Sequence, residues 1–195
     1  MSSTHIEQHF IDSAALLAQC QTVLAEPTAA AAQTLLGALM NDGKLLLCGN
    51  GFAAALADSL CAHLVLRLEQ ERMELAALSL CNNAAILTHL MQHPPTEQLF
   101  AKQIHALGKQ HDVLLLISAL GNEANLLAAV DAAHERSMAV IAFTGGIGGE
   151  LAARLHDQDV LLNIPHNRPM RIWEAQTVLM HALCDHIDHL LLGTA

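Results

Sequence analysis

The stretch that decides the fold runs from residue 44 to residue 53 and reads Lys-Leu-Leu-Leu-Cys-Gly-Asn-Gly-Phe-Ala. Its first half, residues 44–48, is a short apolar run and the first predicted strand, and its second half is a loop with two glycines that leads into a helical pattern. An apolar run of this length without polar alternation is typical of a strand covered on both faces, as in a parallel sheet. We therefore expect a strand, a tight turn and a helix in this stretch.

Further apolar runs have the same character, and helical patterns separate them. The other predicted strands lie at residues 75–80, 113–117, 138–143 and 160–164. The predicted helices lie at residues 5–25, 27–42, 53–68, 83–89, 97–107, 122–135, 149–155 and 169–192, with Pro27 opening the second. Strands that alternate with helices predict an α/β fold in which a five-stranded parallel sheet carries helices on both faces.

The composition bounds the class of protein. The chain has 195 residues, of which 53% are hydrophobic and 14% charged, against roughly 25% charged in an ordinary soluble protein. This excludes disorder and predicts one compact domain. No apolar stretch approaches the roughly 18 residues of a membrane span, and the first residues lack a signal-peptide pattern, so we expect no membrane association and a cytoplasmic protein.

Charge and cysteine usage narrow the class further. The formal net charge of −10 argues against direct contact with nucleic acid, which needs clustered cations. The five cysteines form no C-x-x-C pair, so we expect neither a disulfide nor a structural zinc site. So few charges on so apolar a chain predict that part of the surface is covered by another copy.

Glycine-containing loops at residues 49–53, 118–123 and 144–149 follow predicted strands and lead into helices, whose amino ends suit an anion. With Ala54, the first loop matches G-x-G-x-x-A, but the next strand ends in Leu80-Cys81-Asn82-Asn83, without the acidic residue that a dinucleotide site needs. We therefore expect no nicotinamide cofactor. The glycines can also serve only as tight turns, and we prefer that interpretation for residues 144–149.

Several motifs resemble the sugar isomerase (SIS) domain family, in the branch that holds the phosphoheptose isomerases and the DnaA initiator-associating protein DiaA. The motifs are Cys48-Gly-Asn-Gly, Asp112–Ser118 with Gly121-Asn122, Thr144-Gly145, and Ile164-Pro165 with Arg171-Ile172 and Glu174. Within the branch, Leu183-Cys-Asp185, Ile187-Asp188 and residues 101–108 look closest to DiaA. The resemblance implies a flavodoxin-like sheet and one SIS domain over residues 1–195. That domain would have a helical arm at 1–42 and a core at 43–195 closed by helix 169–192. The N- and C-terminal helices would form an intersubunit bundle in a homotetramer, with a dimer left open.

The resemblance also implies that serines and backbone amides of the first and third loops hold a sugar phosphate. The ligand-binding positions would be Asn50, Gly51, Ser118, Gly121 and Asn122. The first-loop serine of the family falls on Ala53, behind Phe52, and only Ser118 keeps a hydroxyl in the third loop. Glu123 replaces another of those hydroxyls. At about 4 Å from a phosphate it would cost on the order of 4 kcal/mol at an effective dielectric near 20, unless it points to solvent in the first turn of its helix.

Isomerases of this family use a metal-linked set of His, Glu, Gln and His to move a proton between sugar carbons. The set falls on Ser59, His63, Trp173 and His181. Because stable zinc sites use three or four ligands, we expect no cofactor. Only under an isomerase alternative would His181 be catalytic and His63 and His181 hold zinc; otherwise His181 is a polar helix residue with one hydrogen bond.

We therefore expect a non-catalytic homotetramer that resembles DiaA, binds the initiator DnaA and promotes its assembly at the chromosomal origin. Leu191 and Leu192 are the predicted partner contact, although both can instead pack in the subunit bundle. The alternative is a phosphoheptose isomerase acting on sedoheptulose 7-phosphate, or another protein that binds a sugar phosphate. A third possibility is a sensor for an uncharged or differently charged sugar derivative.

Overall fold

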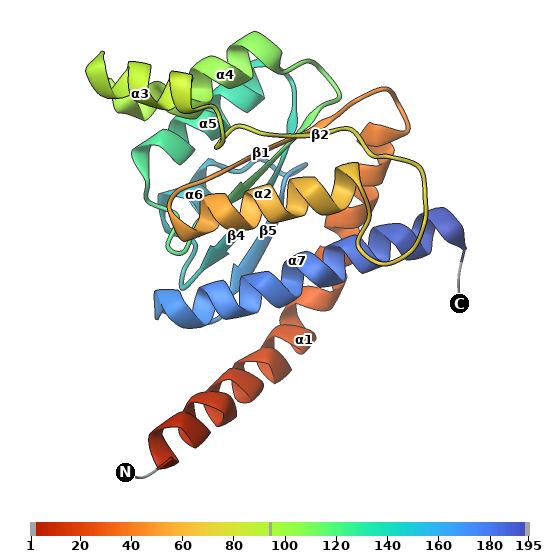
Figure 1. The fold of residues 1–195 in the computed structure, drawn as a ribbon, viewed down its shortest axis with the longest axis vertical. Coiled ribbons are helices and arrows are strands. Elements are labelled where there is room, and N and C mark those ends of the chain that lie inside the picture. Colours follow the sequence, from red (N-terminus) through yellow and green to blue (C-terminus); the bar gives the residue numbers. More distant parts are fainter. Residues whose placement is uncertain (1–2, 94, 194–195) are drawn as a thin grey trace.

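A computed structural model describes residues 3–93 and 95–193 and contains one parallel sheet (Figure 1). Its strands are β1 (Leu45–Gly49), β2 (Ala77–Ser79), β3 (Val113–Ile117), β4 (Ala139–Gly145) and β5 (Val160–Ile164). All neighbouring strands pair in parallel, in the order β2-β1-β3-β4-β5. This is a flavodoxin-like strand order, and it confirms the predicted α/β fold.

The helices flank this sheet on both faces. They are α1 (Thr4–Leu39), α2 (Phe52–Val65), α3 (Ala84–Gln92), α4 (Leu99–Leu107), α5 (Ala124–Glu135), α6 (Gly149–Arg154) and α7 (Pro169–Leu192), with a 3-10 turn η1 (Thr96–Gln98) before α4. Alternate residues of a central strand face opposite sides: Leu45 and Leu47 pack with α1, α2 and α7, and Leu46 and Cys48 with α4, α5 and α6. The central strands are buried because apolar helix faces cover them on both sides.

The second predicted strand is less covered than its sequence suggests. β2 has three residues, lies at the edge of the sheet, and leaves Leu78 42% exposed. The prediction that this strand is covered on both faces was wrong for residues 77–79, because side chains at the edge of a sheet lack the flanking side chains of a second neighbouring strand and are open to solvent from that side. An apolar run alone does not reveal which strand takes the edge position.

The two predicted N-terminal helices are one continuous helix. α1 passes through Pro27 without a break. A proline removes the hydrogen bond to the carbonyl four residues earlier, here that of Val23, whose side chain is half exposed, so that water can reach this turn. One residue later, the Thr28 hydroxyl donates to the Leu24 carbonyl at 2.6 Å. Burial of the residues on both sides of Pro27 therefore outweighs its local preference for a helix start.

A polar cluster ties the first half of α1 to the start of α7. Glu174 accepts from Ser13 at 2.7 Å, from Arg171 at 2.7 Å and from His9 at 2.9 Å. Burial alone would raise the pKa of Glu174, but the hydrogen bonds from Ser13, Arg171 and His9, together with the Arg171 charge, lower it. Glu174 is therefore ionised at neutral pH and holds the two terminal helices together.

Within residues 3–93 and 95–193, no helix has the length and apolarity that crossing a membrane requires.

All five cysteines are free thiols, of which Cys20, Cys48 and Cys184 are buried. Burial raises the pKa of each of these three thiols. Cys20, Cys48 and Cys184 therefore act as small apolar residues in the core.

Candidate functional site

The predicted ligand loops meet at the carboxyl edge of the sheet. β1 ends at Gly49, which lies in register with Ile117 at the end of β3, and Ile117 in turn lies in register with Phe143 of β4. The loops that follow these strands are therefore neighbours. In a sheet of this order, the crevice at the carboxyl ends of the strands is where ligands bind.

The first loop turns sharply into α2 and is tied to α5. Gly51 has a φ of +57°, a conformation that residues with a Cβ rarely adopt. The amides of Asn50 and Asn125 donate to each other, at 2.8 and 2.9 Å. Asn125 was not among the predicted site residues. Its position in the first turn of the helix after the third loop was the available signal.

The third loop is organised around Ser118, which is buried. Its hydroxyl accepts from the backbone N–H of Gly121 at 2.7 Å and of Leu120 at 3.2 Å, and it donates to Oε2 of Glu123 at 2.6 Å. The same carboxylate oxygen accepts from the Asn122 N–H at 3.1 Å. Glu123 is therefore half buried and turned into its own loop, and the alternative that it points to solvent was wrong.

The fourth loop and the start of α6 pack against the third loop through hydrogen bonds and a close backbone approach. The Leu151 N–H donates to the Gly121 carbonyl at 2.9 Å, and the Glu150 N–H donates to the Asn122 side chain at 3.0 Å. A Cβ on Gly149 would lie 2.3 Å from the Leu120 carbonyl oxygen. The glycine therefore permits close packing of two loops, as the tight-turn interpretation expects, and the Asn122 side chain holds α6.

A buried glutamine of α7 lies beneath the third loop and was missed in the sequence. Gln176 donates from Nε2 to the Ser118 carbonyl at 2.7 Å, while its buried Oε1 has no hydrogen-bond partner among the residues that the structure describes. The only signal for this residue was its spacing of three from Trp173, which places it on a neighbouring face of the same helix. α7 therefore contacts the third loop directly and holds its backbone in position through the Ser118 carbonyl.

The seam between α2 and α7 carries the positions of the family's catalytic set. The rings of Phe52 and Trp173 lie 5.2 Å apart, and further along the seam the rings of His63 and His181 lie 5.8 Å apart, edge to face. The Ser59 hydroxyl donates to the Ala55 carbonyl of its own helix at 2.9 Å. The structure thus brings both predicted histidines together, and Phe52 and Trp173 pack against each other nearer the start of the two helices.

This set does not fit the zinc ion that the family implies. His63 and His181 offer two ligand nitrogens, whereas Trp173 offers no lone pair and the Ser59 hydroxyl is already bonded. Stable zinc sites use three or four protein ligands. The seam can hold and move protons on two imidazoles, and we derive no step through a metal.

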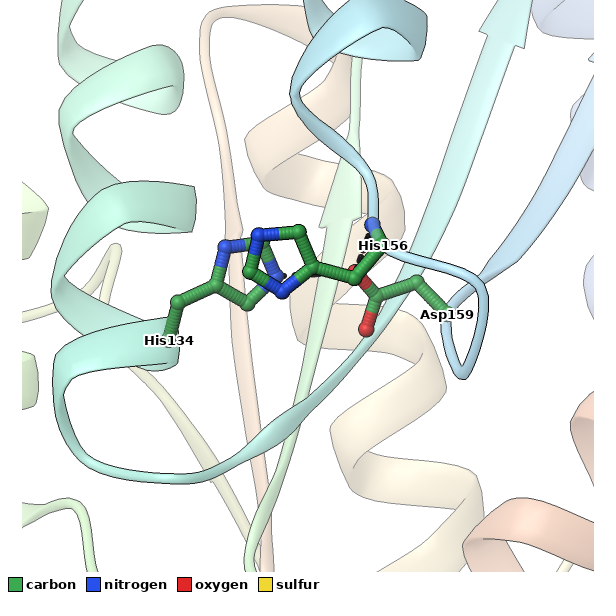
Figure 2. Close-up of side chains that lie close together, drawn as sticks. All are labelled: His134, His156 and Asp159. Carbon is green, nitrogen blue, oxygen red and sulfur yellow. Dashed lines mark hydrogen bonds and ion pairs between the residues drawn. The ribbon is translucent and has the colours of Figure 1, made fainter.

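A second histidine cluster lies at the opposite edge of the sheet, at the end of α5 and before β5 (Figure 2). Asp159 accepts from His134 at 2.8 Å, from the His156 N–H at 2.8 Å and from the Val140 N–H at 2.8 Å. The rings of His134 and His156 are stacked 3.7 Å apart at 15°. A metal binds in the plane of an imidazole, and two nearly parallel planes share no such point here. In this geometry the hydrogen bonds to Asp159 hold the turn before β5 against the end of α5.

Open space remains beside the third loop. A hollow of about 370 Å³ lies between α3, α4 and the start of α5, and Leu90, Met91, Leu99 and Asn125 are among its lining residues. Its walls are largely apolar, with the Asn125 amide at one side. The body of a ligand bound at the sheet edge has room here.

The predicted partner contact lies at the far end of α7. Leu191 is partly buried and packs against the core, whereas Leu192 is 38% exposed. Leu191 thus has an intramolecular role.

The fold, the three neighbouring loops and the paired imidazoles define a class. The SIS domain model matches residues 8–145, and the chain belongs to the SIS domain family. It is 49% identical over 187 residues to the phosphoheptose isomerase of Neisseria gonorrhoeae, covering 96% of this chain and 95% of that one. It is 46% identical over 193 residues to the phosphoheptose isomerase of Methylibium petroleiphilum, covering 99% and 96%.

Solved structures agree with these relatives. Phosphoheptose isomerase GmhA from Neisseria gonorrhoeae superposes with a TM-score of 0.90 at 46% identity, covering 95% of this chain and 98% of that one. A phosphoheptose isomerase from Francisella tularensis superposes with a TM-score of 0.92 at 36% identity, covering 97% and 100%. The backbone of the fold is therefore that of the phosphoheptose isomerases.

These comparisons overturn the prediction of a DiaA-like protein that binds DnaA. Relatives nearly half identical over almost the whole chain are named phosphoheptose isomerase, and nothing in the comparisons points to DnaA. The prediction gave too much weight to a handful of replaced side chains. Those replacements change the chemistry of the cleft, but they leave the remainder of the chain close to the isomerases.

Proposed function

We propose that this chain binds a phosphorylated heptose at the carboxyl edge of the sheet and acts as a phosphoheptose isomerase. The observation that carries the proposal is the pair of imidazoles, His63 and His181, whose rings lie 5.8 Å apart in the seam between α2 and α7. The near-half identity to named phosphoheptose isomerases supports the same activity. The reaction converts sedoheptulose 7-phosphate into an aldoheptose 7-phosphate.

The chemistry needs one group that moves a proton between neighbouring carbons and a second group that exchanges protons with the two oxygens on those carbons. A neutral imidazole can take the proton from C1 of the ketose and return it to C2, while the second donates a proton to the C2 oxygen and accepts one from the O1 hydroxyl. No atom is gained or lost, which is the balance of an isomerisation. In our proposal His63, in place of the family's carboxylate, takes the first role and His181 the second.

The proposal includes no resident metal, because the ligand set of the seam is incomplete. It includes a homotetramer built through the terminal helices. Support comes from an apolar groove of about 350 Å³ between α1 and α7, whose lining includes Leu17, Cys20, Leu24, Val178 and Leu179. Apolar area of this kind is commonly covered by a second copy.

The experiment uses the one tryptophan of the chain as a reporter of the cleft. Trp173 fluorescence is titrated with sedoheptulose 7-phosphate, and conversion to the aldose is followed by chromatography, with and without added Zn²⁺. We expect saturable quenching or enhancement, and turnover that His181→Ala lowers at least a hundredfold, since general acid–base catalysis contributes about 10²–10⁴-fold. The matched control is His189→Ala, a histidine two turns further along the same helix.

A second candidate function is binding of the sugar phosphate without turnover. It is favoured by the missing carboxylate at position 63 and by the bonded Ser59 hydroxyl. The two functions separate in the same experiment, because binding without conversion at any zinc concentration selects the second. Absence of both binding and conversion would overturn the proposal.

A further inference from the structure

We propose that Glu123 is an internal anion that occupies the phosphate position of the third loop, and that it sets the affinity of this chain for phosphorylated ligands. The inference rests on the proposed function, because it concerns the same cleft. Glu123 would decide whether a charged or an uncharged ligand group binds at the third loop.

The hydrogen-bonding capacity of the loop is already used. The Ser118 hydroxyl has one proton, which it donates to Glu123, and two lone pairs, which accept from the N–H groups of Leu120 and Gly121. The Asn122 N–H also donates to Glu123. These polar groups therefore form one network that ends on a carboxylate oxygen of the chain itself.

The position of this carboxylate is that of a bound anion. It lies at the amino end of α5, a helix of 12 residues, with a hydroxyl and a backbone N–H donating to one of its oxygens. Such donors at a helix start attract negative charge. An incoming phosphate would first have to break the hydrogen bonds of the Glu123 carboxylate. It would then also be repelled by the negative charge of that carboxylate, which remains attached to the same loop. Both effects weaken phosphate binding.

The neighbouring donors offer no compensation. The amides of Asn50 and Asn125 are paired with each other between the first loop and α5, and the first loop has Ala53 where a hydroxyl would be needed. A ligand that presents a neutral hydroxyl at the third loop can accept from or donate to this network without meeting a like charge. The carboxylate therefore favours an uncharged sugar group over a phosphate at this position.

The test compares Glu123→Ser and Glu123→Gln with the wild-type chain. Dissociation constants for sedoheptulose 7-phosphate and for unphosphorylated sedoheptulose are measured by calorimetry. Glu123→Ser removes the charge and supplies a hydroxyl that suits the start of a helix; Glu123→Gln removes the charge at nearly constant volume. We expect both variants to bind the phosphorylated sugar at least tenfold more tightly, with a change under twofold for the unphosphorylated sugar.

The matched control is Glu150→Gln, which removes an exposed charge from the first turn of α6, next to the same loop. It should leave both dissociation constants within twofold of the wild type. If the wild-type chain binds the phosphorylated sugar and neither Glu123 variant binds it more tightly, the inference is overturned while the proposed function stands. If the wild-type chain and all variants fail to bind either sugar, the proposed function is overturned and the inference with it.

Discussion

Arg72 joins the end of α2 to α7. Its guanidinium donates to Asp188 of α7 at 2.6 Å and to the carbonyls of His63 and Leu64 at the end of α2, at 2.7 and 2.9 Å. The side chains of Arg72 and Asp188 are 1% and 6% exposed. The pair therefore fixes the end of α2 against α7. Because Arg72 also binds the His63 carbonyl, it helps to fix the position of the His63 side chain in the seam.

Replacing Arg72 should destabilise the chain severely. In Arg72→Met the Asp188 carboxylate stays buried without a partner, and such losses cost about 3–5 kcal/mol. The free energy of unfolding in urea measures the effect. Arg67→Met is the matched control, because Arg67 pairs with Glu71 at the exposed surface, where an ion pair contributes about 0–1 kcal/mol. Equal losses in the two variants would contradict the role of Arg72.

Cys184 makes stability fall at alkaline pH. Burial and the neighbouring Asp188 raise the pKa of this thiol to about 12, against 9.0 for a free thiol. The unfolded chain therefore loses its proton first as pH rises, and the contribution of this thiol is complete below pH 9.0 and is lost between 9.0 and about 12. Urea unfolding at several pH values should show this decline, and Cys184→Ala should make it smaller, with the remainder due to other thiols whose pKa burial raises, such as Cys48. A decline of the same size in the variant would assign the effect to other groups.

The position of most candidate site residues could be predicted from the sequence, but their partners could not. Asn50, Ser118 and Gly121 follow apolar runs, so parallel pairing of the strands places them at one edge. The orientation of Glu123 was open because solvent and loop both satisfy a carboxylate at a helix start. The partner of Asn50 lies 75 residues away, and no local pattern carries that information.

Among the elements, α2 and α7 decide what the seam can do. Both helices are well packed, and their residues at 59, 63, 173 and 181 share the seam. Three of the four positions carry side chains other than those of the family's metal-linked set. The scaffold for that set is therefore present, and the side chains limit the chemistry.

A triple variant should recover a metal site on this scaffold. Ser59→His, His63→Glu and Trp173→Gln together with the native His181 supply the family's ligand set, which meets the three or four ligands that zinc uses. We expect about one Zn²⁺ per chain by mass spectrometry under native conditions, and zinc-dependent conversion of sedoheptulose 7-phosphate. The control variant carries Ser59→Ala, His63→Ala and Trp173→Leu. Equal zinc content in both would show that the seam geometry, rather than its side chains, prevents the site.

The strands and helices were largely predictable, and the exceptions have physical causes. The central strands β1 and β3 match their predicted ranges to within a residue, because burial on both faces leaves an unbroken apolar run. Pro27 was misread as a helix start, although tertiary packing carries α1 through it. The edge position of β2 depends on which strands pair, and an apolar run does not encode that choice.

At the scale of the whole molecule, the terminal helices leave apolar area uncovered. Ile6, Phe10 and Ile11 of α1 are 62%, 70% and 60% exposed, and Val178 of α7 is 48% exposed beside the groove. In Figure 1 the first half of α1 projects away from the sheet and its covering helices. This uncovered area is the surface through which we expect copies to associate.

A single charge on this surface should change the oligomeric state. Phe10→Asp places a carboxylate in the apolar strip of α1, so we expect the proposed tetramer to shift toward smaller species by light scattering coupled to size-exclusion chromatography. Ile147→Asp is the matched control, because Ile147 is 93% exposed in the loop before α6 and far from α1 in the sequence. A wild-type chain that elutes as a monomer would contradict the proposed assembly.

The projection of α1 has a consequence for the free chain in dilute solution. The first buried residue of this helix is Leu16, and the three turns before it are tied to α7 through the cluster around Glu174. A helical segment that short is marginal in water on its own. Upon dilution below the concentration at which copies assemble, these turns should fray and become accessible to proteases while the sheet remains intact. Protein concentration would then decide whether the turns of α1 before Leu16 are helical.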